Sequence, residues 1–186
     1  MEISAQAREQ ARDLLNFIDV SPSPWHAVQT VADRLRRSGF VALREDERWQ
    51  LAAGGRYYVI RGGASIVAFT VGGGELAASG LRVVGAHTGS PGLRVKPKAL
   101  QNGDGLLRLG VEVYGGPILA TFADRDLSLA GRVAVRNGER VEMRMVRFAE
   151  PLLRLPNLAI HMNREVNENG LKFNKQTELP LLLGLG

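Results

Sequence analysis

The chain has 186 residues, no cysteine, a hydrophobic fraction of 45% and a formal net charge of +5 at pH 7. The absence of cysteine excludes disulfides and thiolate zinc sites and suits a reducing compartment. The net positive charge is compatible with nucleic-acid binding, but the arginines are scattered and lack the interleaved aromatic residues of a base-stacking platform. We therefore expect no nucleic-acid partner.

The sequence contains no targeting or membrane-spanning pattern. Residues 1–10 lack a basic segment followed by an apolar core, and no apolar run approaches the roughly 20 residues of a spanning helix. We therefore predict a soluble, cytoplasmic protein without a membrane partner.

Two amphipathic helices are expected near the N-terminus. Apolar residues recur three and four positions apart over residues 4–18. Ser23 and Pro24 then supply the N-cap and first position of a second helix, which ends at Gly39, a left-handed cap. His26, in the first turn of that helix, is predicted to be a surface or capping residue rather than a ligand.

The pattern then changes to strands. Residues 56–60 and 65–71 are rich in β-forming residues and are separated by two glycines, which predicts a hairpin. Residues 81–86 have the length and β-branched content of a buried strand, which would place His87 at its carboxyl end. Ligands collect at such ends in α/β sheets, and a neutral imidazole is the commonest side-chain metal ligand. His87 is therefore a candidate metal ligand; alternatively, it only completes the strand by bonding a nearby carbonyl group.

A mostly β-structured region follows a boundary that we place near residues 96–100. Strands are predicted over residues 106–114, 118–122, 127–135 and 140–148, with an Asn137-Gly138 hairpin turn and no helix of convincing length between residues 98 and 148. The last eight residues are almost entirely apolar, so they are expected to be buried or to continue elsewhere. This end looks like a cut chain.

Five ordered blocks, at residues 21–28, 85–97, 111–116, 124–131 and 156–162, resemble the N-terminal portion of the aspartyl aminopeptidase family. The second block reads GAHTGSPGLRVKP and the fifth reads PNLAIHM. The resemblance implies an α/β fold, a zinc-peptidase α/β sandwich interrupted by a β-rich inserted dimerisation domain. Residues 1–97 would be the N-terminal part of the catalytic domain, and residues 98–186 the beginning of the inserted domain.

The same resemblance implies a metallo-aminopeptidase, a hydrolase that removes N-terminal residues, especially Asp or Glu, from peptides. In the family, two zinc ions activate a water molecule, a carboxylate takes its proton, and the hydroxide attacks the peptide carbonyl. The family's enzymes assemble into dodecamers. His87 matches a ligand of the zinc pair, whereas His161 matches an active-site histidine that either joins the zinc residues or reaches a neighbouring subunit's site.

The resemblance also implies that this site is incomplete. The family's remaining ligands and its general base belong to sequence beyond the insertion, and Asp104 or Glu112 would complete a site only by a geometry that the sequence does not reveal. We therefore expect the chain to be inactive alone. The alternative function is a non-catalytic oligomerisation or peptide-binding module.

One position departs from the family pattern. The family has His-Thr-Asp-Ser-Pro, and this chain has Gly89 at the place of the aspartate that orients the metal-bound imidazole. Loss of such a group typically costs about 10–100-fold in metal affinity or activity. In the fourth block, Arg125 lies either between the carboxylates of Asp124 and Asp126 or in a solvated turn.

Overall fold

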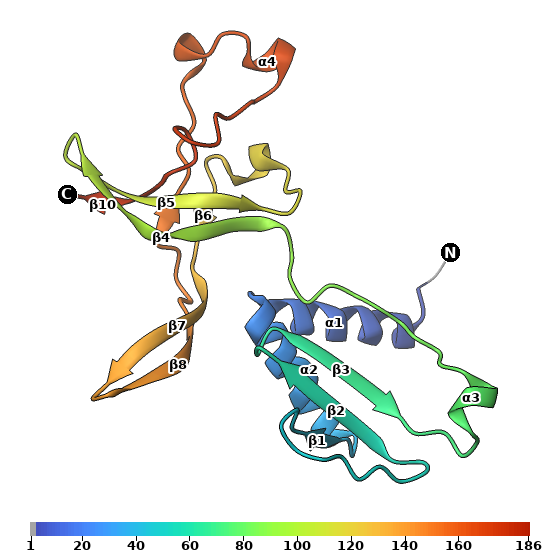
Figure 1. The fold of residues 1–186 in the computed structure, drawn as a ribbon. Helices are drawn as coiled ribbons and strands as arrows, with labels where there is room; N and C mark the ends of the chain where they lie inside the picture. The colour runs from blue at the N-terminus through green and yellow to red at the C-terminus, as the bar shows by residue number, and fades with distance from the viewer. Residues whose placement is uncertain (1–2) are drawn as a thin grey trace. The chain divides into compact units, whose positions relative to one another are not determined.

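The computed structural model describes residues 3–186, and it is a mixed α/β structure (Figure 1). The described residues form two compact units. The first unit contains residues 3–90 and 130–146, and the second contains residues 91–129 and 147–186. The assignment of residues 1–97 to a catalytic domain and of residues 98–186 to an inserted domain remains a prediction.

Both predicted helices of the first unit are present. α1 spans Ala5–Asp19, and α2 spans Pro24–Arg37. The Ser23 hydroxyl caps α2 by accepting the backbone N–H of His26 at 3.4 Å and lies 2.7 Å from His26 Nδ1. Gly39 follows α2 with φ +80°. The predicted caps are confirmed, and His26 belongs to the cap of α2.

A three-stranded sheet packs against α2 (Figure 1). Its order is β1-β2-β3, with β1 at Val41–Leu43, β2 at Arg56–Arg61 and β3 at Ser65–Thr70. β1 runs parallel to β2, and β2 pairs antiparallel with β3, so the predicted hairpin is confirmed. The core of this unit is small: α2 buries Ala27, Val28 and Ala32, and β2 buries Tyr57 and Tyr58.

The strand predicted over residues 81–86 is not formed. After the short helix α3, Leu76–Ser79, the chain carries no regular structure up to residue 91. Val83 is 83% exposed and Val84 is 98% exposed. A strand needs a neighbour that satisfies its N–H and C=O groups. No strand among the described residues pairs with this segment, so its β-rich composition is not sufficient.

A second hairpin completes the first unit. It joins β7, Ala130–Asn137, to β8, Arg140–Arg147, which confirms the predicted hairpin. The strand predicted over residues 127–135 is instead divided between β6, Asp126–Leu127, and β7. The two turn residues are Gly138 and Glu139, one position later than predicted. Only Gly138 has a positive φ, +62°, as expected where glycine takes the first position of a two-residue turn.

The second unit is a five-stranded antiparallel sheet of order β4-β5-β10-β9-β6. β4 spans Gly92–Gly103, β5 spans Leu106–Tyr114, β9 spans Leu153–Arg154, and β10 spans Leu181–Leu185. The prediction of β5 is confirmed. β4, however, crosses the boundary that was predicted near residues 96–100. Its register shifts between Val95 and Leu100, which accommodates Pro97, a residue without an N–H for the ladder.

Residues 118–122 are not a strand. Leu119–Phe122 form a 3₁₀ helix, η1, after Pro117. Both the backbone N–H and the hydroxyl of Thr121 donate to the Ile118 carbonyl, at 3.0 and 2.7 Å. This local bonding replaces a ladder partner. The only other helices in the described part of the second unit are also short: the 3₁₀ helix η2, Ile160–Met162, and α4, Val166–Asn169.

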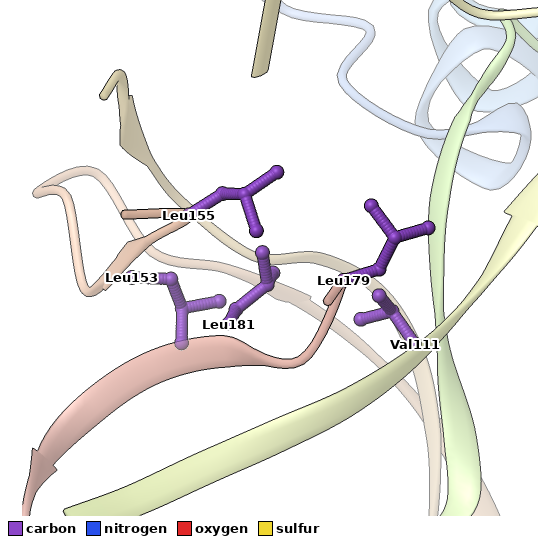
Figure 2. Packing of buried hydrophobic residues seen from close by; sticks show 5 residues of the cluster. All are labelled: Val111, Leu153, Leu155, Leu179 and Leu181. Carbon is purple, nitrogen blue, oxygen red and sulfur yellow. The ribbon is translucent and has the colours of Figure 1, made fainter. Parts of the chain in front are cut away.

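The core of the second unit is formed by residues of β5, β9 and β10 and by residues next to β9 and β10. It consists of Val111, Leu153, Leu155, Leu179 and Leu181 (Figure 2). Leu155 and Leu179 are fully buried at 0% exposure. The start of the apolar C-terminal run is therefore buried, one of the two predicted outcomes, whereas Leu185 at the end of β10 is 87% exposed. Among the helices of the described residues, none has the length and apolar character needed to cross a bilayer.

Candidate functional site

His87 lies on an exposed, irregular segment of the first unit. The next residue anchors this segment: the Thr88 hydroxyl donates to the Ala64 carbonyl, at the turn between β2 and β3, over 2.8 Å. The backbone beside His87 is thus tied to the sheet, although no strand delivers the histidine. The imidazole remains accessible to a ligand.

Gly89 follows two residues after His87 and is partly buried. Residues 88–92 contain no carboxylate, so no group in this stretch replaces the aspartate of the family pattern. An imidazole that binds metal through one nitrogen usually donates its other N–H to a carboxylate, a carbonyl or water. Gly89 has no side-chain acceptor for this N–H.

His161 lies in η2 of the second unit, and its side chain is exposed. The turn is closed by two backbone hydrogen bonds. Met162 N–H donates to Ala159 O at 2.8 Å, and Asn163 N–H donates to Ile160 O at 3.2 Å. His87 and His161 therefore belong to different compact units, and each is presented on an accessible turn.

An arginine does lie beside Asp124 and Asp126, but it is Arg154. Its Nη1 is 3.0 Å from Asp126 Oδ1, and its Nε is 3.9 Å from Asp124 Oδ1. Arg125 is exposed and, within residues 3–186, makes no ion pair, so the solvated-turn alternative holds for it. Sequence reasoning missed Arg154 because it lies 28 residues from Asp126 and no local pattern links the two.

The described residues do not form a complete metal centre. A zinc site requires at least three protein ligands. Residues 3–186 contain no cluster of three histidine, aspartate or glutamate side chains suited to a metal ion. The two carboxylates considered as additional ligands face cations: Glu112 is 3.3 Å from Lys96 Nζ, and Asp104 is 3.8 Å from Arg108 Nη2. The described residues therefore offer His87 and His161 as separate candidate ligands and not a formed zinc site.

Solved structures with this fold define the class of protein. One similar structure is a chain of "Cryo-EM structure of the Ape4 and Nbr1 complex", with 41% sequence identity and a TM-score of 0.89. The match covers 100% of the present chain and 36% of that chain. Another is a chain of "Structure of Chaetomium thermophilum mApe1", with 31% sequence identity and a TM-score of 0.83. This match covers 94% of the present chain and 40% of that chain. The fold is that of the aminopeptidase I zinc metalloproteases.

The family assignment follows from sequence comparison. The model of the family described as "Aminopeptidase I zinc metalloprotease (M18)" matches residues 17–186. A relative from Stutzerimonas stutzeri, named "Probable M18 family aminopeptidase 2", is 50% identical over 175 residues, which are 94% of this chain and 41% of the relative. The chain belongs to the M18 family, which confirms the resemblance noted above. It spans about two fifths of the length of this curated relative.

Proposed function

We propose that this chain contributes part of the active site of a zinc-dependent aminopeptidase that releases N-terminal residues, especially Asp or Glu, from peptides. The observation that carries the proposal is the M18 match over residues 17–186, which includes the GAHTGSP block around His87. A neutral His87 imidazole would supply one ligand to a pair of zinc ions, and the Thr88 anchor would restrain its backbone. Bound zinc would supply an activated water.

The rest of the site would come from residues outside this chain. His87 and the cap residue His26 are the histidines of its unit, no cluster of three potential ligands is present among the described residues, and three ligands are the minimum. We therefore propose that the 186-residue chain is inactive alone. Gly89 would weaken the site, because no carboxylate at this position orients the imidazole.

We propose that His161 serves either as a further metal residue or as a residue that enters a neighbouring subunit's site. Its exposure on η2 supports both roles. The second alternative requires self-association, for which the family suggests a dodecamer, with the second unit as the beginning of the inserted dimerisation domain. Peptides are the proposed substrates, the cytoplasm is the proposed location, and neither nucleic acid nor a membrane is a proposed partner.

The alternative function, a non-catalytic oligomerisation or peptide-binding module, is favoured by one feature of the β7–β8 hairpin. Val141, Met143 and Met145 alternate along β8 and are 67, 52 and 43% exposed. Alternate residues of a strand share a face, so this strand presents an apolar row to its surroundings. Such a row suits an apolar partner better than water.

The decisive experiment joins this chain to the portion of the Stutzerimonas relative that lies beyond the matched residues. We expect zinc-dependent release of N-terminal Asp or Glu from a peptide, and we expect His87→Ala to abolish it. In calorimetry, the isolated chain should show no binding at micromolar zinc.

Three results would contradict the proposal. A folded fusion with equal activity after His87→Ala would remove His87 from the site. Release of N-terminal residues by the isolated chain would show a complete site. Zinc binding by the isolated chain that requires His87 would indicate a site assembled between copies.

A further inference from the structure

Asp124 has an unusual backbone conformation that the surrounding structure holds in place. Its φ is +52°, in the left-handed region, which disfavours most residues but tolerates Asp and Asn. Its N–H donates to the carbonyl of Leu155 at 2.8 Å, and Ala123 forms a parallel bridge with Leu155. Leu155 is fully buried, so the core of the second unit fixes the backbone of Asp124.

The Asp124 side chain then begins a chain of contacts toward η2. Its Oδ1 accepts the N–H of Asn157 at 3.2 Å. The Asn157 side-chain Oδ1 in turn accepts the N–H of Leu158 at 2.9 Å. Ala159, the next residue, accepts the N–H of Met162 and so closes the turn that contains His161. Two hydrogen bonds and a short stretch of backbone therefore link Asp124, which is held by the core, to this turn.

Burial does little to hold this turn. The large apolar side chains in this turn and just before it are exposed by 55% at Leu158, 45% at Ile160 and 72% at Met162. A segment that buries so little apolar surface is ordinarily among the first to open. The position of this turn therefore depends largely on the hydrogen bonds of Asn157, just before the turn begins.

We infer that Asp124 is a positioning residue for His161. Through its bond to Asn157, which lies four residues before His161, Asp124 sets the direction in which the chain leaves the core. This inference rests on the proposed function only for the statement that His161 takes part in the reaction. The hydrogen-bonded path from Asp124 to the turn is present irrespective of that role.

Aspartate meets two requirements at this position, and substitutions separate them. Asp124→Gly retains the left-handed backbone but removes the acceptor for Asn157 N–H. Asp124→Asn retains both the backbone preference and an acceptor oxygen. Asp126→Asn weakens the shorter contact with Arg154 and leaves the Asn157 bond untouched, so it is the matched control.

The experiment measures amide hydrogen exchange and the His161 ring resonances by NMR in the 186-residue chain. Asp124→Gly should accelerate exchange roughly tenfold or more at Asn157 and Met162, as expected when a hydrogen bond to a charged acceptor is lost. It should also shift the His161 ring signals, with β5 and β10 protected as before. Asp124→Asn and Asp126→Asn should remain close to the unsubstituted chain.

Two outcomes would overturn the inference. One is unchanged exchange at Asn157 and Met162 in Asp124→Gly. The other is an equal acceleration in β5 and β10, because this would mean general destabilisation rather than positioning.

The proposed function is tested separately in the fusion with the Stutzerimonas portion. Asp124→Gly should lower kcat there. Zinc affinity should fall as well if His161 is a metal residue, and it should stay unchanged if His161 enters a neighbouring subunit's site. If the turn opens as expected in the isolated chain but kcat does not change, the positioning by Asp124 stands and the proposed role of His161 fails.

Discussion

Arg154 pairs with Asp126 directly across the short antiparallel ladder of β6 and β9, with Nη1 and Oδ1 3.0 Å apart. Each of these strands has only two residues, so the ladder contains two residue pairs. The ion pair therefore adds a side-chain contact where backbone pairing is minimal. Opposite charges across a strand pair stabilise a sheet modestly.

Arg154→Gln should loosen this ladder at a small energetic cost. The two side chains are 48% and 69% exposed, and exposed pairs contribute about 0.2–1 kcal/mol. Urea unfolding should show a loss in that range that shrinks in 1 M salt, and Arg125→Gln should be neutral. A loss above about 3 kcal/mol would instead indicate the behaviour of a buried ion pair.

Leu155→Ala should be among the most destabilising substitutions in the second unit. Leu155 is fully buried, and truncation of a buried leucine costs about 2–5 kcal/mol through lost transfer energy and the cavity that remains. Leu158→Ala is the matched control, since Leu158 is 55% exposed and should change stability by no more than about 0.5 kcal/mol. Urea unfolding followed by far-ultraviolet circular dichroism makes the comparison, and equal losses would contradict the core assignment.

The features that were predicted correctly from the sequence are local. Ser23 with Pro24 begins α2, Gly39 ends it, and glycine turns join β2 to β3 and β7 to β8. In each case the residues that determine the conformation lie within a few positions of it. Residues 81–86 show the limit, because a strand also depends on a neighbour that its own sequence does not identify.

The candidate site shows the same division. His87 was proposed as a ligand from its own neighbourhood and from the family blocks, and this role remains a prediction with which the exposure of its side chain is compatible. Arg154 was missed because its partner Asp126 lies 28 residues earlier. The contact of Asp124 with Asn157 spans 33 residues, and the pairing of β6 with β9 and of Ala123 and Asp124 with Leu155 brings these segments together.

Gly138→Ala should destabilise the β7–β8 hairpin for conformational rather than steric reasons. Gly138 has φ +62°, yet a Cβ placed there would meet no atom within 4 Å. An alanine in the left-handed region costs about 1–2 kcal/mol. Hydrogen exchange of the hairpin amides should accelerate by about tenfold, corresponding to that free energy. Gly72→Ala, in equally open space without a positive φ, is the control and should leave exchange unchanged. If the hairpin amides exchanged at the same rate in Gly138→Ala and Gly72→Ala, the turn would not require a positive φ at residue 138.

The contact between α1 and α2 should depend on pH through Asp13. Arg34 donates to both carboxylate oxygens of Asp13 at 2.8 Å, and its guanidinium also lies over the Phe17 ring at 5.2 Å. No residue of α1 is buried, so the contact between Asp13 and Arg34 is important for holding α1 against α2. The hydrogen bond from Arg34, together with its charge, lowers the pKa of Asp13 below its ordinary value.

A lowered folded-state pKa means that the stabilisation is complete above the unfolded pKa of about 3.9 and is lost as the pH falls through the folded value. Amide exchange in α1, compared with that in α2 between pH 6 and pH 2 after correction for intrinsic rates, should therefore rise selectively below about pH 4. Asp13→Asn should show fast exchange in α1 at every pH and no acid step, because its side chain does not titrate. If the unsubstituted chain and Asp13→Asn gave the same profile, the acid sensitivity would have to arise elsewhere, as at Glu142, whose pKa is lowered by hydrogen bonds from Asn137 and Arg144.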